Sequence, residues 1–280
     1  MTPEPRFDAY APTLRGVSLE SCVRVLESEL GCAARSGGSR RRYGQVVDLK
    51  IGADLVAWVG HDHASGDLYL EAKGETTPEV VQAVRGHWPK HSAARLDVCG
   101  DWDGELMFDY LQEVAREVKG QKVRAGYVAL PDDPSEGRTW AMGKRGGVAY
   151  ARLYEAGKQK EKAHWCRPNA VRFELEARPH YARDKVAAAT MTPAQVFGIT
   201  PWSRRVAAAL FQREIERFEA EVKISTHDRT TLYIARAFRR HFSEMLEDLG
   251  DWECVGRELA SVWAGDDEFA AKVAASRKPK

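Results

Sequence analysis

The sequence predicts an α+β protein with a mainly antiparallel sheet, followed by a helical C-terminal region. In the first two thirds of the chain, strand-like and helical segments alternate, and many neighbouring strand-like segments are joined by short turns rich in Gly, Asp and Pro. Tight turns join antiparallel neighbours, whereas parallel strands require long crossovers. From Ser203 onward the apolar residues recur at helical spacing.

The expected elements of the first part begin with a strand at residues 7–16 and an amphipathic helix at 18–30, whose apolar residues fall on one face. A basic loop follows at 36–45, and residues 45–74 contain two or three strands separated by Gly and Asp turns. A short helix at 77–88 begins with a Thr and a Pro, a common helix start.

The second part begins with a strand around Asp97 and a helix at 105–119. Strands at 123–130 and 138–142 and strands around Tyr154 and Glu174 follow. The last expected elements are helices at 203–222, 229–249 and 252–262.

We expect a domain boundary near residue 190. Residues 1–190 would form the sheet domain and residues 191–280 a helical region for DNA binding or dimerisation. No internal repeat is apparent.

The bulk composition limits the possible partners and location. The net charge of +1 over 280 residues excludes a global basic signature, so any nucleic acid must be bound by local patches. Five scattered cysteines without a CxxC pair argue against a disulfide framework or a zinc knuckle and fit a reducing cytoplasm. No apolar stretch approaches the ~18 residues of a membrane span, so we expect a cytoplasmic protein without membrane contact.

Three strand-like segments between Arg95 and Arg178 carry polar and apolar residues in alternation. Residues two apart share one face of a strand. The residues expected on the polar face are Arg95, Asp97, Cys99, Asp101, Tyr150, Arg152, Tyr154, Arg172, Glu174 and Glu176. If the segments lie in one sheet, this face has the composition of a metal and nucleophile site.

The acidic residues Asp97, Glu174 and Glu176 are candidate metal ligands. Mg²⁺ and Mn²⁺ prefer carboxylate oxygens, and two or three of these on one sheet face can bind one ion. The alternative is a solvated polar face whose carboxylates pair with neighbouring arginines.

Tyr154 is a candidate nucleophile. A tyrosine hydroxyl can attack a phosphodiester that a metal ion polarises. Arg152 and Lys158 could then stabilise the charge that develops on the phosphate. The alternative is a tyrosine that only packs in a strand.

Other features have weaker chemical meaning. His61 and His63 alternate along a strand and could share a metal ion, but the favoured interpretation is the polar end of a hairpin. The GKRGG segment, with Lys144 and Arg145, is either a basic loop that contacts DNA phosphates or a plain turn. Arginines of the 229–249 helix could contact DNA or simply face solvent.

Three segments follow one another along the chain: RLDVCGDWDG at 95–104, GRTWAMGKRGGVAYARLYEAGKQ at 137–159 and VRFELEAR at 171–178. In this order they resemble the replication initiation factor family of rolling-circle plasmids and phages. FDAY at 7–10 and TPAQVFGITPWSR at 192–204 add to the similarity.

The resemblance implies an endonuclease-like sheet and an initiator that nicks one strand of origin DNA. By motif, Tyr154 would attack the phosphodiester and stay joined to the 5′ phosphate, with Asp97, Glu174 and Glu176 holding Mg²⁺ or Mn²⁺. Single- and double-stranded origin DNA, a host helicase and a second copy of the chain are the implied partners. The expected DNA-contacting residues are Lys144, Arg145, Arg172, Arg236 and Arg240.

Two departures from the family pattern keep other functions open. GKRGG stands where the family favours G-S-R-x-S, and Ala156 stands where the family has a lysine. One alternative is a non-catalytic DNA-binding regulator with the same fold. Another is a metal-dependent nuclease in which water attacks the phosphodiester.

Overall fold

The computed structural model describes residues 2–38, 40, 43–62, 64–133, 135–159, 167–218, 234 and 237–263. The chain divides into two compact units, Met1–Glu221 and Val222–Lys280. Arg236 and His63, both singled out from the sequence, lie outside the described residues.

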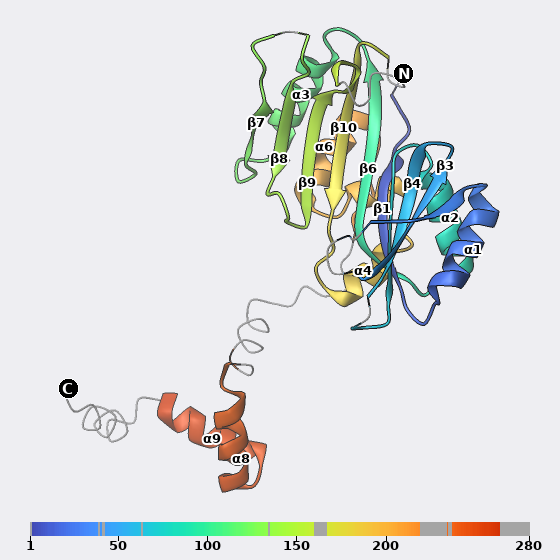
Figure 1. Cartoon of the computed structure of the whole chain (residues 1–280). Coiled ribbons are helices and arrows are strands. Elements are labelled where there is room, and N and C mark those ends of the chain that lie inside the picture. The colour runs from blue at the N-terminus through green and yellow to red at the C-terminus, as the bar shows by residue number, and fades with distance from the viewer. Residues whose placement is uncertain are drawn as a thin grey trace, which may run out of the picture. The chain divides into compact units, whose positions relative to one another are not determined.

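The first unit is built on one antiparallel sheet (Figure 1). Its described strands are Arg6–Leu14 (β1), Ala33–Ser36 (β2), Gln45–Ile51 (β3), Asp54–His61 (β4), Leu68–Lys73 (β5), Ser92–Asp103 (β6), Ala125–Ala129 (β7), Thr139–Gly143 (β8), Ala149–Glu155 (β9) and Ala170–Ala177 (β10). These ten strands lie in the order β2-β3-β4-β5-β1-β6-β10-β9-β8-β7, and every neighbouring pair is antiparallel. The predicted α+β class with an antiparallel sheet is confirmed.

The described helices of this unit are Leu19–Leu30 (α1), Thr77–His87 (α2), Met107–Val118 (α3), Ala182–Ala188 (α4), Pro193–Phe197 (α5) and Pro201–Phe211 (α6). The second unit contains Arg239–Leu249 (α8) and Trp252–Trp263 (α9). These two helices coincide with the described part of the helices expected at 229–249 and 252–262.

The sheet contains a structural duplication that the sequence did not reveal. The elements β1-α1-β2-β3-β4-β5-α2 form an N-terminal copy, and β6-α3-β7-β8-β9-β10-α4 repeat the same series as a C-terminal copy. The sheet order therefore reads the same from both edges, with β1 and β6 paired at the centre (Figure 1). Short sequence pairs accompany it: Arg-x-Asp at 6–8 and 95–97, and Leu-Glu-Ala followed by Lys or Arg at 70–73 and 175–178.

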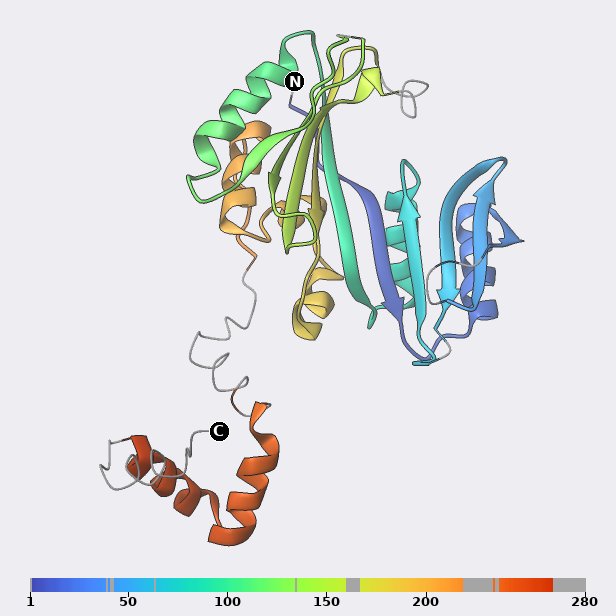
Figure 2. The ribbon, with the colours of Figure 1, turned by 60° about the vertical axis from the view of Figure 1, so that its left-hand side comes forward.

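The core lies between the helices and one face of the sheet. Apolar residues of β6, β9 and β10 such as Val98, Leu153 and Phe173 are fully buried in one cluster with helix residues such as Phe108 and Val80. Figure 2 shows α3 and α6 packed along the strands of the C-terminal copy. The charged residues of the same strands lie on the other face, so the predicted division of faces is correct.

The first compact unit continues past the expected boundary at residue 190. Thr192 and Thr200 cap α5 and α6, each with a Pro at the start of the helix. Both helices bury apolar side chains against the sheet, and the Phe197 ring stacks on Phe173 at 5.6 Å. Because this packing ties them to the sheet, α5 and α6 belong to the first unit.

Strand β2 was not expected, because residues 33–36 read Ala-Ala-Arg-Ser and have weak strand propensity. It pairs with β3 from Ala33↔Lys50 to Ser36↔Val47. Pairing with a strong neighbouring strand overrides the local preference.

Candidate functional site

Strand pairing brings the polar residues of β6, β10 and β9 together in rows across the sheet. The rows are Asp101, Arg172 and Tyr154; Cys99, Glu174 and Arg152; and Asp97, Glu176 and Tyr150. Neighbouring strands lie about 4.8 Å apart, so residues in a row are within side-chain reach of one another. Tyr154 therefore lies one row from Glu174 and two rows from Asp97 and Glu176.

A cleft of ≈ 480 Å³ opens on this polar face of the sheet. The C-terminal copy contributes Tyr154, Arg152 and Glu174 to its walls, and the N-terminal copy contributes Asp8 and Lys73. Its complete lining is Asp8, Ala9, Lys73, Gly74, Arg95, Asp97, Thr139, Arg152, Tyr154, Gln159, Arg172 and Glu174. The cleft thus spans the central strands where the two copies meet.

Tyr154 is hydrogen-bonded to an acidic partner at the bottom of this cleft. Its hydroxyl donates to Glu174 Oε2 at 2.9 Å, and Arg152 donates to the other carboxylate oxygen of Glu174. Tyr154 is 3% exposed. Burial, followed by the negative charge of Glu174, raises the pKa of Tyr154 well above its ordinary value, so the phenol is protonated at neutral pH.

The other two acidic residues are held by arginines. Arg95 donates from Nε to Asp97 Oδ1 at 2.8 Å, and Arg95 Nη2 lies 3.3 Å from Glu176 Oε2. Arg178 donates to Glu176 Oε1 at 2.5 Å. Burial, with the charges of Glu174 and Glu176, raises the pKa of Asp97 to about 7, although Arg95 opposes the shift. Burial also acts to raise the pKa of Glu176, but its arginine partners outweigh burial and lower that pKa overall.

The acidic cluster has the donor chemistry of a hard-cation site but not a complete ligand set. Within the described ranges, no group of three His, Cys, Asp or Glu side chains is arranged to hold a metal ion. Asp97 and Glu174 both line the cleft, whereas Glu176 does not. Two carboxylates remain compatible with Mg²⁺, which commonly keeps several waters and takes one or two carboxylates together with substrate phosphate.

Arg172 is a buried connector between the two copies. Its side chain is 1% exposed and donates to Asp101 at 2.6 and 2.9 Å and to Asp8 on β1 at 2.6 Å. Arg6 of β1 also donates to Asp101, at 2.5 Å. The expectation that Arg172 contacts DNA does not fit this position, because the guanidinium is enclosed and bonded to two carboxylates.

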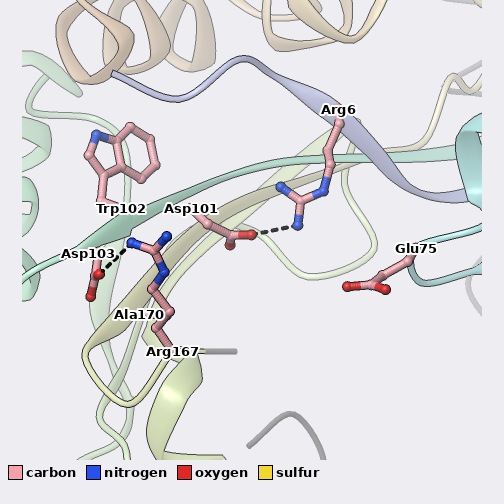
Figure 3. A pocket seen from close by; sticks show the side chains of 7 residues that line it. All are labelled: Arg6, Glu75, Asp101, Trp102, Asp103, Arg167 and Ala170. Carbon is pink, nitrogen blue, oxygen red and sulfur yellow. Dashed lines mark hydrogen bonds and ion pairs between the residues drawn. The ribbon is translucent and has the colours of Figure 1, made fainter. Parts of the chain in front are cut away.

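A second cleft, of ≈ 350 Å³, adjoins this buried network (Figure 3). Arg6 and Asp101 meet on one side of it, and Arg167 bonds Asp103 at 2.9 Å on the other. Burial acts to raise the pKa of Asp101, but the hydrogen bond and charge of Arg172 outweigh it and lower the pKa overall. Asp101 is therefore ionised, and it lines this second cleft while it holds Arg172, which lines the first.

Lys158 does not lie where the sequence suggested. It follows β9 in a short 3-10 turn, Ala156–Lys158, and its Nζ binds Glu155 Oε1 at 3.0 Å. It lines a different pocket, with Glu155 and Glu105, and not the cleft of Tyr154. A role beside Tyr154 would require Lys158 to leave Glu155.

Lys144 and Arg145 are placed at the opposite end of the β8–β9 hairpin. Gly143 pairs with Tyr150 near the turn, whereas Thr139 pairs with Tyr154 at the other end. At about 3.3 Å per residue, the turn lies roughly 20 Å along β9 from Tyr154. Both residues are exposed and do not line the Tyr154 cleft.

Two further candidates lie away from the cleft. His61 ends β4, which is separated from β6 by β5 and β1. Arg240 belongs to α8 of the second unit, where it is 88% exposed and bonds Glu244 at 2.8 Å.

Asp8 and Lys73 are site residues that sequence reasoning missed. Both belong to the N-terminal copy, whereas the site was expected only between Arg95 and Arg178. The signal that could have found them is the internal match of residues 6–8 with 95–97 and of 70–73 with 175–178.

No protein-family model and no curated protein matches the sequence. Among solved structures, the chain is similar to "Structure of Rolling Circle Replication Initiator Protein from Geobacillus stearothermophilus". The TM-score is 0.49 at 17% identity, over 79% of this chain and 89% of that chain. At 17% identity, this structural similarity assigns no functional residue and no reaction to the chain. None of the described helices has the length and hydropathy needed to cross a membrane.

Proposed function

We propose that the protein initiates rolling-circle replication by nicking one strand of origin DNA with Tyr154 as the nucleophile. The observation that supports this most is the hydrogen bond from the Tyr154 hydroxyl to Glu174 at 2.9 Å, in a cleft lined by basic side chains. A nucleophile in hydrogen-bond contact with a base that a third group orients is the arrangement that activates a hydroxyl. Here Glu174 is the base, and Arg152 orients it.

The proposed step exchanges one phosphodiester bond for another. The Tyr154 oxygen forms a bond to the phosphorus, and its proton passes to Glu174. The bond from phosphorus to the 3′ oxygen breaks, and that oxygen leaves with the electron pair and takes a proton from solvent in the cleft. The products are a 5′-phosphotyrosine and a free 3′-hydroxyl that can prime synthesis.

A bound cation would lower the cost of negative charge in the cleft. Burial and nearby carboxylates raise the pKa values of Tyr154 and Asp97, so the phenolate is costly in the cleft without added positive charge. We assign a Mg²⁺ or Mn²⁺ site to Asp97 and Glu174. The ion would supply charge stabilisation for the phosphate oxygens and the leaving oxygen.

Supercoiled plasmid carrying the origin, with Mn²⁺ or Mg²⁺, provides the test. We expect wild-type protein to convert it to the nicked form and Tyr154→Phe to bind DNA without nicking. Nicking by the Phe variant would overturn the assignment of the nucleophile, and nicking that leaves no protein on the 5′ end would favour attack by water.

A non-catalytic DNA-binding regulator is the second candidate function. The observation in its favour is that arginines engage all three acidic residues expected to bind metal. Origin binding by wild-type protein without nicking in either metal would support it.

A further inference from the structure

The N-terminal copy of the duplicated sheet forms one wall of the Tyr154 cleft. Lys73, at the end of β5, pairs with Ala9 of β1, and Ala9 pairs in turn with Asp97 of β6. Two strand spacings separate Lys73 from Asp97, which is about 10 Å between backbones. The small side chain of Ala9 lines the cleft between them and leaves space there for a ligand.

Lys73 is the most accessible of the cations that line this cleft. Its side chain is 61% exposed, against 37% for Arg152. Arg95 and Arg172 are 17% and 1% exposed, and both are bonded to carboxylates. A ligand that enters from solvent therefore meets Lys73 first.

The ammonium of Lys73 is anchored but not enclosed. Nζ lies 2.5 Å from Glu71 Oε1, and Glu71, itself buried, also accepts a bond from Tyr69 at 3.3 Å. An ammonium carries three N–H donors, and the bond to Glu71 uses one of them. The C-terminal copy has an equivalent pair, in which a cation bonds a glutamate two residues earlier in the same way: Arg178 bonds Glu176 at 2.5 Å.

We infer that Lys73 binds a backbone phosphate of the DNA strand that lies across the cleft, on the side of the cleft opposite Tyr154. The N-terminal copy thus supplies strand-holding charge to a reaction that the C-terminal copy carries out. This inference rests on the proposed function for the identity of the ligand, a single DNA strand. The competing explanation is that the Lys73–Glu71 pair only stabilises the end of β5.

Binding of a fluorescent single-stranded oligonucleotide, measured by anisotropy at several salt concentrations, tests the inference. The parent protein carries Tyr154→Phe, so that cleavage cannot distort the measurement. We expect Lys73→Gln to weaken binding about fivefold, the factor for one exposed ion pair. The slope of log affinity against log salt should fall by about 0.7, as for one lost contact to a single strand.

Two variants serve as controls. Lys73→Arg retains the charge and should restore both affinity and slope. Lys122→Gln removes an exposed lysine that does not line the cleft and should leave both unchanged. Equal thermal midpoints for Lys73→Gln and Lys122→Gln would show that the binding loss is not a folding defect.

The outcomes separate this inference from the proposed function. If wild-type protein nicks the plasmid while Lys73→Gln binds like Lys122→Gln, the inference alone fails. If binding depends on Lys73 but wild-type protein does not nick, the phosphate site stands and the nickase fails. Absence of oligonucleotide binding by the parent would overturn both.

Discussion

Replacing Arg172 by Met should be among the most destabilising single changes in the sheet unit. Arg172 is 1% exposed, and its guanidinium joins Asp101 of the neighbouring strand β6 to Asp8 of β1. Met fills much of the volume but leaves Asp8 without its cation and Asp101 with Arg6 alone. Removing one partner of a buried ion pair typically costs about 3–5 kcal/mol.

The lower end of that range applies here. Asp8 and Asp101 keep 18% and 26% of their side chains exposed, so water can hydrate part of the charge that is left. A loss of about 3 kcal/mol corresponds to roughly 6–12 °C in the unfolding midpoint of a unit of this size. Arg178→Met, which breaks a pair with a 40% exposed arginine, should cost no more than about 1 kcal/mol.

Differential scanning calorimetry of the full chain measures these shifts. The double variant Arg172→Met/Asp8→Asn should recover part of the loss, because it removes one uncompensated charge. A midpoint for Arg172→Met that matches that of Arg178→Met would refute the view that this buried network holds the two copies together.

Two further predictions concern stability away from the cleft. His91 donates from Nδ1 to the Trp88 carbonyl, and burial, with the charge of Arg85, lowers its pKa. The unfolded chain therefore binds a proton at His91 more readily than the folded chain does. The stability that this histidine contributes is present above about pH 6.5 and is lost as the pH falls through the lowered pKa of the folded state. In urea titrations, the wild type should lose more stability than His91→Gln between about pH 7.5 and 5, and equal losses would exclude His91 as the cause. At Gly60 of β4, an added Cβ would lie 2.7 Å from the Tyr43 ring, so Gly60→Ala should cost about 1–3 kcal/mol in thermal unfolding. Gly38→Ala, which meets nothing within 4 Å, is the matched control, and equal midpoints would contradict the close packing of Tyr43 on the sheet.

Local pattern was sufficient to predict most strands and the faces of the strands that carry the candidate site. The alternation within residues 150–154 and within residues 171–176 predicts that Tyr154 and Glu174 share a face if the two segments lie in one sheet. The pairs Arg172↔Tyr154 and Glu174↔Arg152 place them on that common face. The Tyr154 hydroxyl lies 2.9 Å from Glu174 Oε2.

The duplication and the ion pairing could not be read from local pattern. The two copies share only short matches, and which strands meet at the centre of a sheet depends on long-range pairing. The sequence showed that Arg172 shares a face with acidic residues, but not that it is buried. The burial of Arg172 depends on a partner far away in the sequence, since its guanidinium bonds Asp8, 164 residues away.

The most direct test of the account is mass spectrometry of the protein after reaction with a single-stranded oligonucleotide that contains the origin nick site, in Mn²⁺. We expect a tryptic peptide with a nucleotide attached through the 5′ phosphate to Tyr154, and no adduct in Tyr154→Phe. An adduct on another residue, or cleaved DNA without any adduct, would contradict it.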